Sequence, residues 1–227
     1  MLTLKIGVTA VLIVLWAGAV SAAQVAPVPQ TGILVLSHDA NEPPRDDGAL
    51  LKGVTLPTPR FTDNLNGTIT DNLTRLIWLK NANCPVFGRT WQDALDDVAQ
   101  LNTSGTMNAN DCGDTSGKRG SHQTDWRLPN IRELFSLVDF SFWHPALSNA
   151  AGTGHATTPG DPFSNFENPS TFPYEPIYWS STNRDPSSGN YAWYVNFVDG
   201  NVHFNANAVL NIGKLNTYFV IAVRGGS

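Results

Sequence analysis

Two serines and a histidine near the C-terminus are the residue types that a hydrolase would need. Ser180 and Ser181 lie in a β-prone run, and His203 follows further along the chain, so a nucleophile with its base is one interpretation. No Gly-x-Ser-x-Gly sequence surrounds the serines, and no partner acid is placed by spacing. Hydrolysis is therefore a remote alternative, and we expect the chain not to be an enzyme.

Asparagines alternate with apolar residues in the C-terminal region. Such a pattern places amides on the outward face of strands and loops, where they can donate and accept hydrogen bonds to a ligand. The other interpretation is that these asparagines only serve turns. We expect segments 183–190 and 201–216 to form a ligand-binding surface. The candidate residues are Asn183, Arg184, Asp185, Asn190, Tyr191, Asn201, His203, Asn205 and Asn207.

Acidic and amide side chains also cluster between Asp63 and Asp71, as in a calcium-binding loop. If Gly67 takes the sixth position of such a loop, Thr62 falls at the first and Leu73 at the twelfth, where a glutamate should close the site. The register therefore argues against calcium, and we expect neither a metal nor a cofactor.

Trp126, Arg127 and Trp179 could form a stacking platform for a sugar ring, although their apolar surroundings favour core positions.

The chain opens with the pattern of a secretory signal peptide. Lys5 precedes an apolar stretch from Ile6 to Val20, and small residues follow up to Ala23, so we expect residues 1–23 to be removed. The apolar stretch is shorter than the roughly 20 residues of a membrane-spanning helix. The mature chain is therefore expected to be exported, without a membrane span, and to be periplasmic, cell-surface or secreted.

Both cysteines, Cys84 and Cys112, lie in the mature chain. Because a pair of cysteines in an oxidising compartment favours a disulfide over a metal site, we expect a bridge that closes a loop of 112 − 84 = 28 residues.

The formal net charge is −5, and no run of basic residues occurs. A nucleic-acid partner is therefore not expected, because phosphate binding needs concentrated Lys and Arg.

Pro-, Asp- and Gly-rich sequence from 24 to 59 predicts an extended arm or linker with a short strand at Ile33 to Leu36, and residues 60–227 predict one domain. The dipeptide Asn66-Gly67 between Thr-rich runs predicts a hairpin with a two-residue type I′ turn. Asp199-Gly200 predicts a second hairpin. The expected strands are 76–79, 177–181, 191–197, 201–204 and 218–223.

Two helices are predicted by their capping residues. Thr90 with Asp93 begins the first, which should bury Trp91, Ala94, Leu95 and Val98. Asn130 with Glu133 begins the second, whose buried face should be formed by Ile131, Leu134, Phe135 and Val138. Between the helices, residues 102–124 are expected to be a polar loop. Helices and strands segregated in this way indicate an α+β domain.

Several ordered motifs resemble the Lcl C-terminal-like domain family. They are Arg60 to Lys80, Thr90-Trp91, Asp125 to Asn130 with Glu133-Leu134, Tyr178 to Thr182, and Val223 to Gly226. The positions that we take as its structural signature are Asn66, Gly67, Trp78, Trp126, Arg127, Leu128, Pro129, Trp179 and Arg224.

The resemblance implies a C-type-lectin-like fold, akin to that of formylglycine-generating enzymes, in exported bacterial proteins. It implies binding and no known reaction, because the cysteines of those enzymes lie late in their domain and this chain has none after Cys112. We therefore expect a recognition module for an unknown protein or glycan. The alternative is a structural or assembly subunit of an envelope or extracellular complex, docked through the arm.

Overall fold

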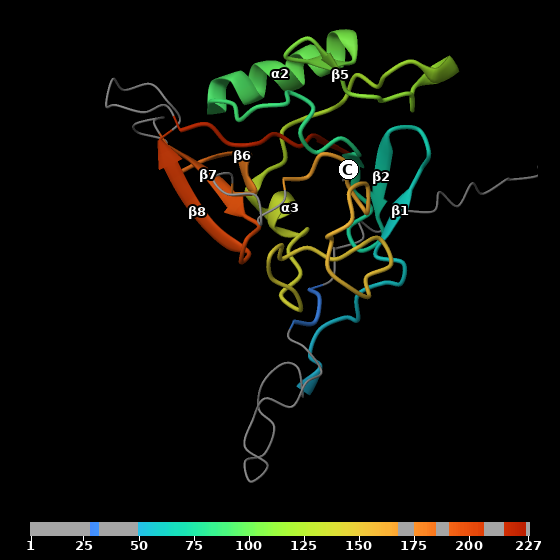
Figure 1. The fold of residues 1–227 in the computed structure, drawn as a ribbon, viewed down its shortest axis with the longest axis vertical. Helices are drawn as coiled ribbons and strands as arrows, with labels where there is room; N and C mark the ends of the chain where they lie inside the picture. Colours follow the sequence, from blue (N-terminus) through green and yellow to red (C-terminus); the bar gives the residue numbers. More distant parts are fainter. Residues whose placement is uncertain (1–27, 32–49, 168–174, 185–190, 207–215, 226–227) are drawn as a thin grey trace, which may run out of the picture.

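The computed structural model describes residues 28–31, 50–167, 175–184, 191–206 and 216–225 (Figure 1). The predicted signal peptide and the short strand expected at 33–36 lie outside the described residues. In the described part of the arm, Pro29 pairs with Val54 in a parallel bridge. Figure 1 shows these pieces, in blue and cyan, below the body of the domain.

A four-stranded antiparallel sheet joins the start of the domain to its end. Its order is β1 (Phe61–Asp63), β2 (Thr68–Asp71), β3 (Ile77–Leu79) and β9 (Val223–Arg224). The predicted strand at 76–79 is thus confirmed. In the segment expected to form a strand at 218–223, only the last residue belongs to β9.

The first hairpin is confirmed, but its predicted two-residue turn is wrong. The Asn64 N–H donates to the Thr68 carbonyl at 3.0 Å, which closes a three-residue loop of 65–67. Leu65 and Gly67 take the positive φ angles, 58° and 81°. Tertiary packing accounts for the difference, because the Asn66 carbonyl accepts a hydrogen bond from the Thr115 N–H at 2.9 Å.

Gly67 packs so closely on residue 113 that no side chain fits there. A Cβ atom at this position would overlap the Gly113 carbonyl oxygen, and the backbone already has positive φ. We expect Gly67→Ala to lower the free energy of unfolding by about 3 kcal/mol or more, since clash and conformational strain add. The matched control is Gly120→Ala, with φ 79° and open space around its Cβ, which should cost only about 1–2 kcal/mol. Equal losses in urea unfolding would contradict the packing argument.

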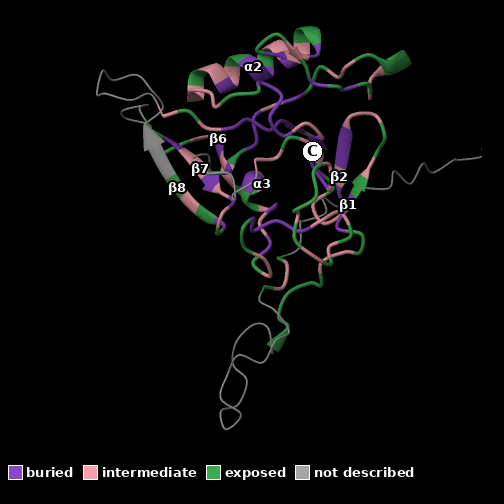
Figure 2. Ribbon diagram, in the orientation of Figure 1, coloured by how far each residue is buried: buried purple, intermediate pink, exposed green. Residues whose placement is uncertain are grey.

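Helix α2 (Trp91–Ser104) begins where its capping residues predict. The Thr90 side chain accepts a hydrogen bond from the Asp93 N–H, and Gly105 ends the helix at a φ of 73°. Its buried residues are Ala94, Asp97, Val98 and Leu101, while the predicted Trp91 and Leu95 are partly buried. Figure 2 shows the inner side of α2 as buried and its outer side as exposed.

Helix α3 (Ile131–Phe135) has the predicted capping box between Asn130 and Glu133. The predicted apolar face is only partly correct. Phe135, the last residue of the helix, is exposed, and Leu137, which lies beyond the helix, belongs to the same core cluster as Leu134.

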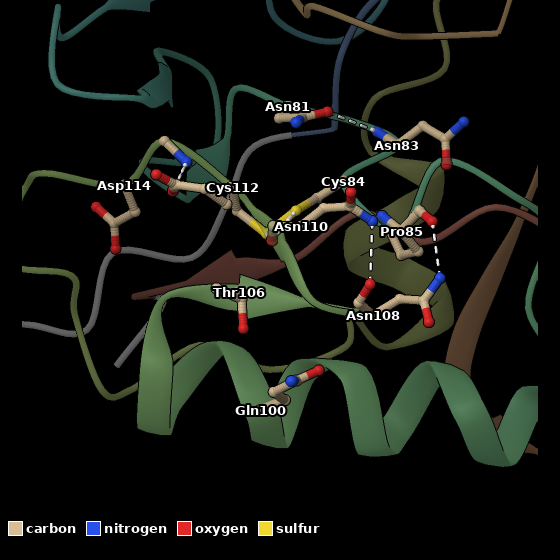
Figure 3. The surroundings of a disulfide bond; sticks show 12 residues. Asn81, Asn83, Cys84, Pro85, Gln100, Thr106, Asn108, Asn110, Cys112 and Asp114 are labelled. Carbon is tan, nitrogen blue, oxygen red and sulfur yellow. Dashed lines mark hydrogen bonds between the residues drawn. A yellow bond between two sulfur atoms is a disulfide. The ribbon is translucent and has the colours of Figure 1, made fainter.

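The disulfide between Cys84 and Cys112 is confirmed, with a Cα–Cα distance of 5.3 Å (Figure 3). Cys112 follows a short hairpin of β4 (Thr106–Met107) and β5 (Asn110–Asp111), and η1 (Lys118–Gly120) comes next. Residues 102–124 are thus more ordered than the polar loop we expected, and α2 occupies their beginning. The bridge ties the chain ahead of α2 to this hairpin.

A three-stranded antiparallel sheet of order β6-β7-β8 forms the other side of the domain (Figure 1). Its strands are β6 (Ile177–Asn183), β7 (Tyr191–Asn196) and β8 (Asn201–Ala206), and the predicted hairpin at Asp199-Gly200 joins β7 to β8. Residues 218–222 connect this sheet to the first. The Trp179 N–H donates to the Phe219 carbonyl at 3.1 Å, and the Leu79 N–H donates to the Ala222 carbonyl at 2.9 Å.

Both faces of the three-stranded sheet are packed against the core at β6 and β7, whereas Asn201 and His203 of β8 are exposed. One core cluster contains Val195 and Phe197 with Leu134 of α3, and the other contains Trp179 and Ala192 with α2 residues such as Val98. These clusters hold the sheet in place between the two helices. The described domain is therefore α+β, as predicted.

Candidate functional site

The register of the three-stranded sheet places predicted ligand residues on one face. Tyr194 lies opposite His203, and Asn196 lies opposite Asn201. Further along β8, Asn205 pairs with Ala192 in the backbone register. Asn201 and His203 are exposed.

A second predicted group lies at the far end of the same sheet. Asn183 ends β6 and is exposed, and the next residue, Arg184, donates its N–H to the Tyr191 carbonyl at 2.9 Å. The Arg184 guanidinium carbon lies 5.6 Å from the centre of the Tyr191 ring, a cation–π arrangement. The structure thus brings Asn183, Arg184 and Tyr191 together. Asp185, Asn190 and Asn207 lie outside the described residues.

An aromatic cluster lies at the middle of this face. The Tyr194 ring centre is 5.9 Å from that of His203, 4.9 Å from that of Tyr218 and 6.2 Å from that of Trp179. Trp179 is fully buried and donates its indole N–H to the Arg89 carbonyl at 2.9 Å, whereas Tyr194 and Tyr218 are half-buried. The cluster, defined as Trp179, Tyr194, His203 and Tyr218, thus rises from the core to the surface.

Sequence reasoning missed Tyr194 and Tyr218. The Asp199-Gly200 hairpin could have revealed Tyr194, because this turn sets Tyr194 opposite His203. Nothing local marks Tyr218, which reaches the cluster through its antiparallel bridge to Arg89.

The hydroxyl of Tyr194 is held neutral. Burial, together with the neighbouring Tyr218 hydroxyl and the Glu175 carboxylate, raises the pKa of Tyr194 to about 12. At neutral pH the phenol keeps its proton, as it would at its ordinary pKa, and can both donate and accept a hydrogen bond.

The raised pKa of Tyr194 predicts a loss of stability at alkaline pH. In the unfolded chain Tyr194 ionises near pH 10, whereas the folded protein retains the proton up to about pH 12. This contribution is therefore fully present below pH 10 and is lost as the pH rises from 10 to 12. In urea unfolding, the wild type should lose stability relative to Tyr194→Phe across this range. A constant difference between the two proteins would contradict the assignment.

Amides and carboxylates border the cluster. The Asn196 amide donates to Glu175 at 2.9 Å, and the Asn201 amide donates to Asp199 at 2.5 Å. The face thus combines aromatic rings with polar groups that remain capable of further hydrogen bonds. Such a surface suits a ligand with both apolar and hydroxyl or amide groups.

The stacking platform considered for Trp126, Arg127 and Trp179 is not formed: the core interpretation is confirmed for both tryptophans, and Arg127 donates to Glu133 at 2.7 Å. Both indoles are buried, and Trp126 donates its indole N–H to Asp114 at 2.8 Å. Burial opposes ionisation of Asp114, but hydrogen bonds from Gln123, Ser116 and Trp126 outweigh it, so the Asp114 pKa lies below its usual value.

A groove opens beside Trp126, between α2 and β6. Its volume is about 340 Å³. The lining residues are Leu95, Val98, Ala99, Asn102, Trp126, Arg127, Leu128 and Ser181. Asn102 fixes one wall, since its amide both donates to the Trp126 carbonyl and accepts from the Trp126 N–H, each at 2.8 Å.

The residues considered for hydrolysis and for calcium binding have other contacts in the structure. Ser180 is fully buried and donates its hydroxyl to the Trp193 carbonyl at 2.7 Å, while His203 is exposed on β8. Asp63 binds Lys80 at 2.6 Å, and this hydrogen bond is the main cause of a lowered Asp63 pKa. Among the residues that the structure describes, no group of three or more His, Cys, Asp or Glu is arranged to hold a metal ion.

The fold defines an α+β domain with a single described disulfide and an aromatic face on its smaller sheet. Residues 67–224 match the Lcl C-terminal domain, and the chain therefore belongs to this family. The match confirms the resemblance seen in the motifs. Strand β1 lies before the matched residues, but it belongs to the same sheet as β2, β3 and β9. No curated protein matches the sequence. Within the described ranges, no helix is long and apolar enough to cross a membrane.

Proposed function

We propose that the chain is an exported recognition module that binds a protein or a glycan without catalysis. The observation that carries this proposal is the half-exposed aromatic cluster on the β6-β7-β8 face. Tyr194, His203 and Tyr218 offer ring surface to a ligand, and the buried Trp179 fixes them from below. Aromatic side chains with few rotatable bonds provide contact area at low entropic cost.

The scaffold supports binding because it is preorganised. The strand segment carrying Tyr218 is fixed by two hydrogen bonds with Arg89, of 2.7 and 3.0 Å, and Trp179 donates to the same residue. A ligand that docks on this face would order few protein groups, which favours affinity.

Two further parts of the proposal concern the fold type and the compartment. A C-type-lectin-like fold is supported by the pairing of early and late strands in one sheet, β1-β2-β3-β9. Export to the periplasm, the cell surface or the medium is supported by the leader-like residues 1–23 and by the disulfide.

The proposal is tested by comparing binding of the mature chain with that of two variants. Labelled protein is applied to arrays of glycans and of extracellular proteins, with calcium and with a chelator. We expect wild type to bind its ligand both with calcium and with the chelator. The affinity should fall at least tenfold in Tyr194→Ala/His203→Ala and by a smaller factor in His203→Ala alone. Trp143→Ala, an exposed ring outside this sheet, is the matched control and should bind normally. Undiminished binding by the folded double variant would contradict the proposal.

A second candidate function is that of an assembly subunit that docks through the arm. The observation that favours it is the exposure of Val28, Leu50, Leu51 and Val54, all apolar residues of the arm. A chain beginning at residue 60 should then lose assembly and keep ligand binding. If assembly survives this deletion, the arm is not the docking element.

A further inference from the structure

Three aromatic rings that take no part in the cluster of Trp179, Tyr194, His203 and Tyr218 are exposed at the end of α3 and in the segment that follows it. Trp143 is 67% exposed, Phe140 is 49% exposed and Phe135 is 37% exposed. The ring centres of Phe135 and Phe140 lie 5.9 Å apart, so these two form a continuous patch. Isolated exposed apolar residues are ordinary, but a Trp and two Phe within nine residues are not.

The loop that carries two of these rings has a fixed base. The Asp139 N–H donates to the Ala146 carbonyl at 3.0 Å, which closes the loop of 139–146, and the His144 N–H donates to the Val198 carbonyl at 2.8 Å. Phe140 also abuts Gly200, where an added Cβ would come within 3.1 Å of its ring. The rings are therefore presented by an ordered loop. We call Phe135 and residues 139–146 the aromatic loop.

The chemistry of the aromatic loop suits an apolar phase. The loop's one charged residue with His neutral, Asp139, is buried, and residues 140–145 read Phe-Ser-Phe-Trp-His-Pro and carry no formal charge. A glycan would require several polar side chains beside the rings, and this segment offers only Ser141 and His144. The three rings expose roughly 300 Å², well below the roughly 800 Å² per partner of a stable protein interface. Docking on a lipid surface needs buried apolar area but no matching partner surface.

We propose that the aromatic loop docks the protein peripherally on a lipid bilayer, with Trp143 and Phe140 inserted among the headgroups. Trp is favoured at this depth because its ring is amphipathic. The exposed charges nearest in the chain and at the adjoining hairpin, Arg132 and Asp199, are of opposite sign. With a net charge of −5, the protein gains nothing from an anionic surface, so the bilayer is zwitterionic. This surface shares no residue with the proposed ligand face, and its role does not depend on that function.

The experiment is cosedimentation of the mature chain with phosphatidylcholine vesicles, alone or with added phosphatidylglycerol. We expect wild type to sediment with pure phosphatidylcholine vesicles, insensitively to salt, and Phe140→Ser/Trp143→Ser to partition at least tenfold less. Phe87→Ser, which removes a ring that is 70% exposed elsewhere, is the matched control and should partition as wild type does. Tyr194→Ala/His203→Ala should also partition normally, which separates this proposal from the proposed ligand site. Thermal unfolding verifies that each variant is folded.

Three results would overturn the proposal. Wild type could fail to bind phosphatidylcholine vesicles, or bind only anionic vesicles in a manner abolished by salt. The Phe140→Ser/Trp143→Ser variant could bind as wild type does. Sedimentation velocity without lipid could show that wild type self-associates and that the variant does not, which would make the patch a contact between copies of the chain.

Discussion

Replacing Asp71 with alanine should lower the free energy of unfolding by about 3–5 kcal/mol, because it leaves a buried guanidinium without its partner. Asp71 is fully buried and pairs with Arg60, which is also buried. It further accepts hydrogen bonds from the Leu73 N–H and the Thr74 hydroxyl, each at 2.7 Å. The second Arg60 nitrogen donates to the Ser136 carbonyl at 2.9 Å, so the pair also joins the first sheet to the end of α3.

The matched control is Asp125→Ala, which removes a carboxylate that binds Arg224 at 2.8 Å in an exposed setting. Exposed pairs contribute roughly 0–1 kcal/mol, so this variant should unfold almost as wild type does. Both variants are measured by urea unfolding at neutral pH. Similar losses in the two variants would show that burial does not strengthen the Arg60–Asp71 pair.

Removing the disulfide should have the second large effect. Replacing Cys84 and Cys112 together with alanine opens a loop of 28 residues, and the chain-entropy model predicts a loss of about 3–4 kcal/mol. The bridge is buried beside Leu101 and Met107, so some packing is lost as well. The expected result is a lower urea midpoint with a steeper slope, because the unfolded chain without its cross-link is less compact and exposes more surface.

Reduction of the wild-type protein provides the control for the cysteine variant. Oxidised wild type should be the most stable form, and reduced wild type should unfold close to the variant. If the variant and oxidised wild type have the same urea midpoint, the disulfide does not stabilise the fold.

The elements that local chemistry controls could be predicted from the sequence. The capping residues Thr90 and Asn130 set the beginnings of α2 and α3, and the Asp199-Gly200 turn sets the β7-β8 hairpin. The disulfide was predicted from the number of cysteines and the expected export of the chain. What failed depended on contacts distant in sequence, such as the packing on Gly113 that changes the turn at 65–67.

The candidate site could be predicted only in part, for the same reason. The exposure of Asn201 agrees with the alternating pattern, and His203 is also exposed, but the β6-β7 pairing that brings Asn183 near Tyr191 was not predicted. The ring cluster could not be predicted from the sequence. Tyr218 is brought to it by a β-bridge to Arg89, which lies 218 − 89 = 129 positions earlier in the chain. The exposure of Phe135 also escaped prediction, since nothing local indicated that α3 ends there.

The most direct test of the central claim is the affinity of wild type and Tyr194→Ala/His203→Ala for whichever glycan or protein the arrays identify. If the β6-β7-β8 face binds the ligand, the folded double variant should bind at least tenfold more weakly than wild type, while Trp143→Ala should keep wild-type affinity. If the double variant retains full affinity, or if the folded mature chain binds nothing on either array, the β6-β7-β8 face is not a recognition surface.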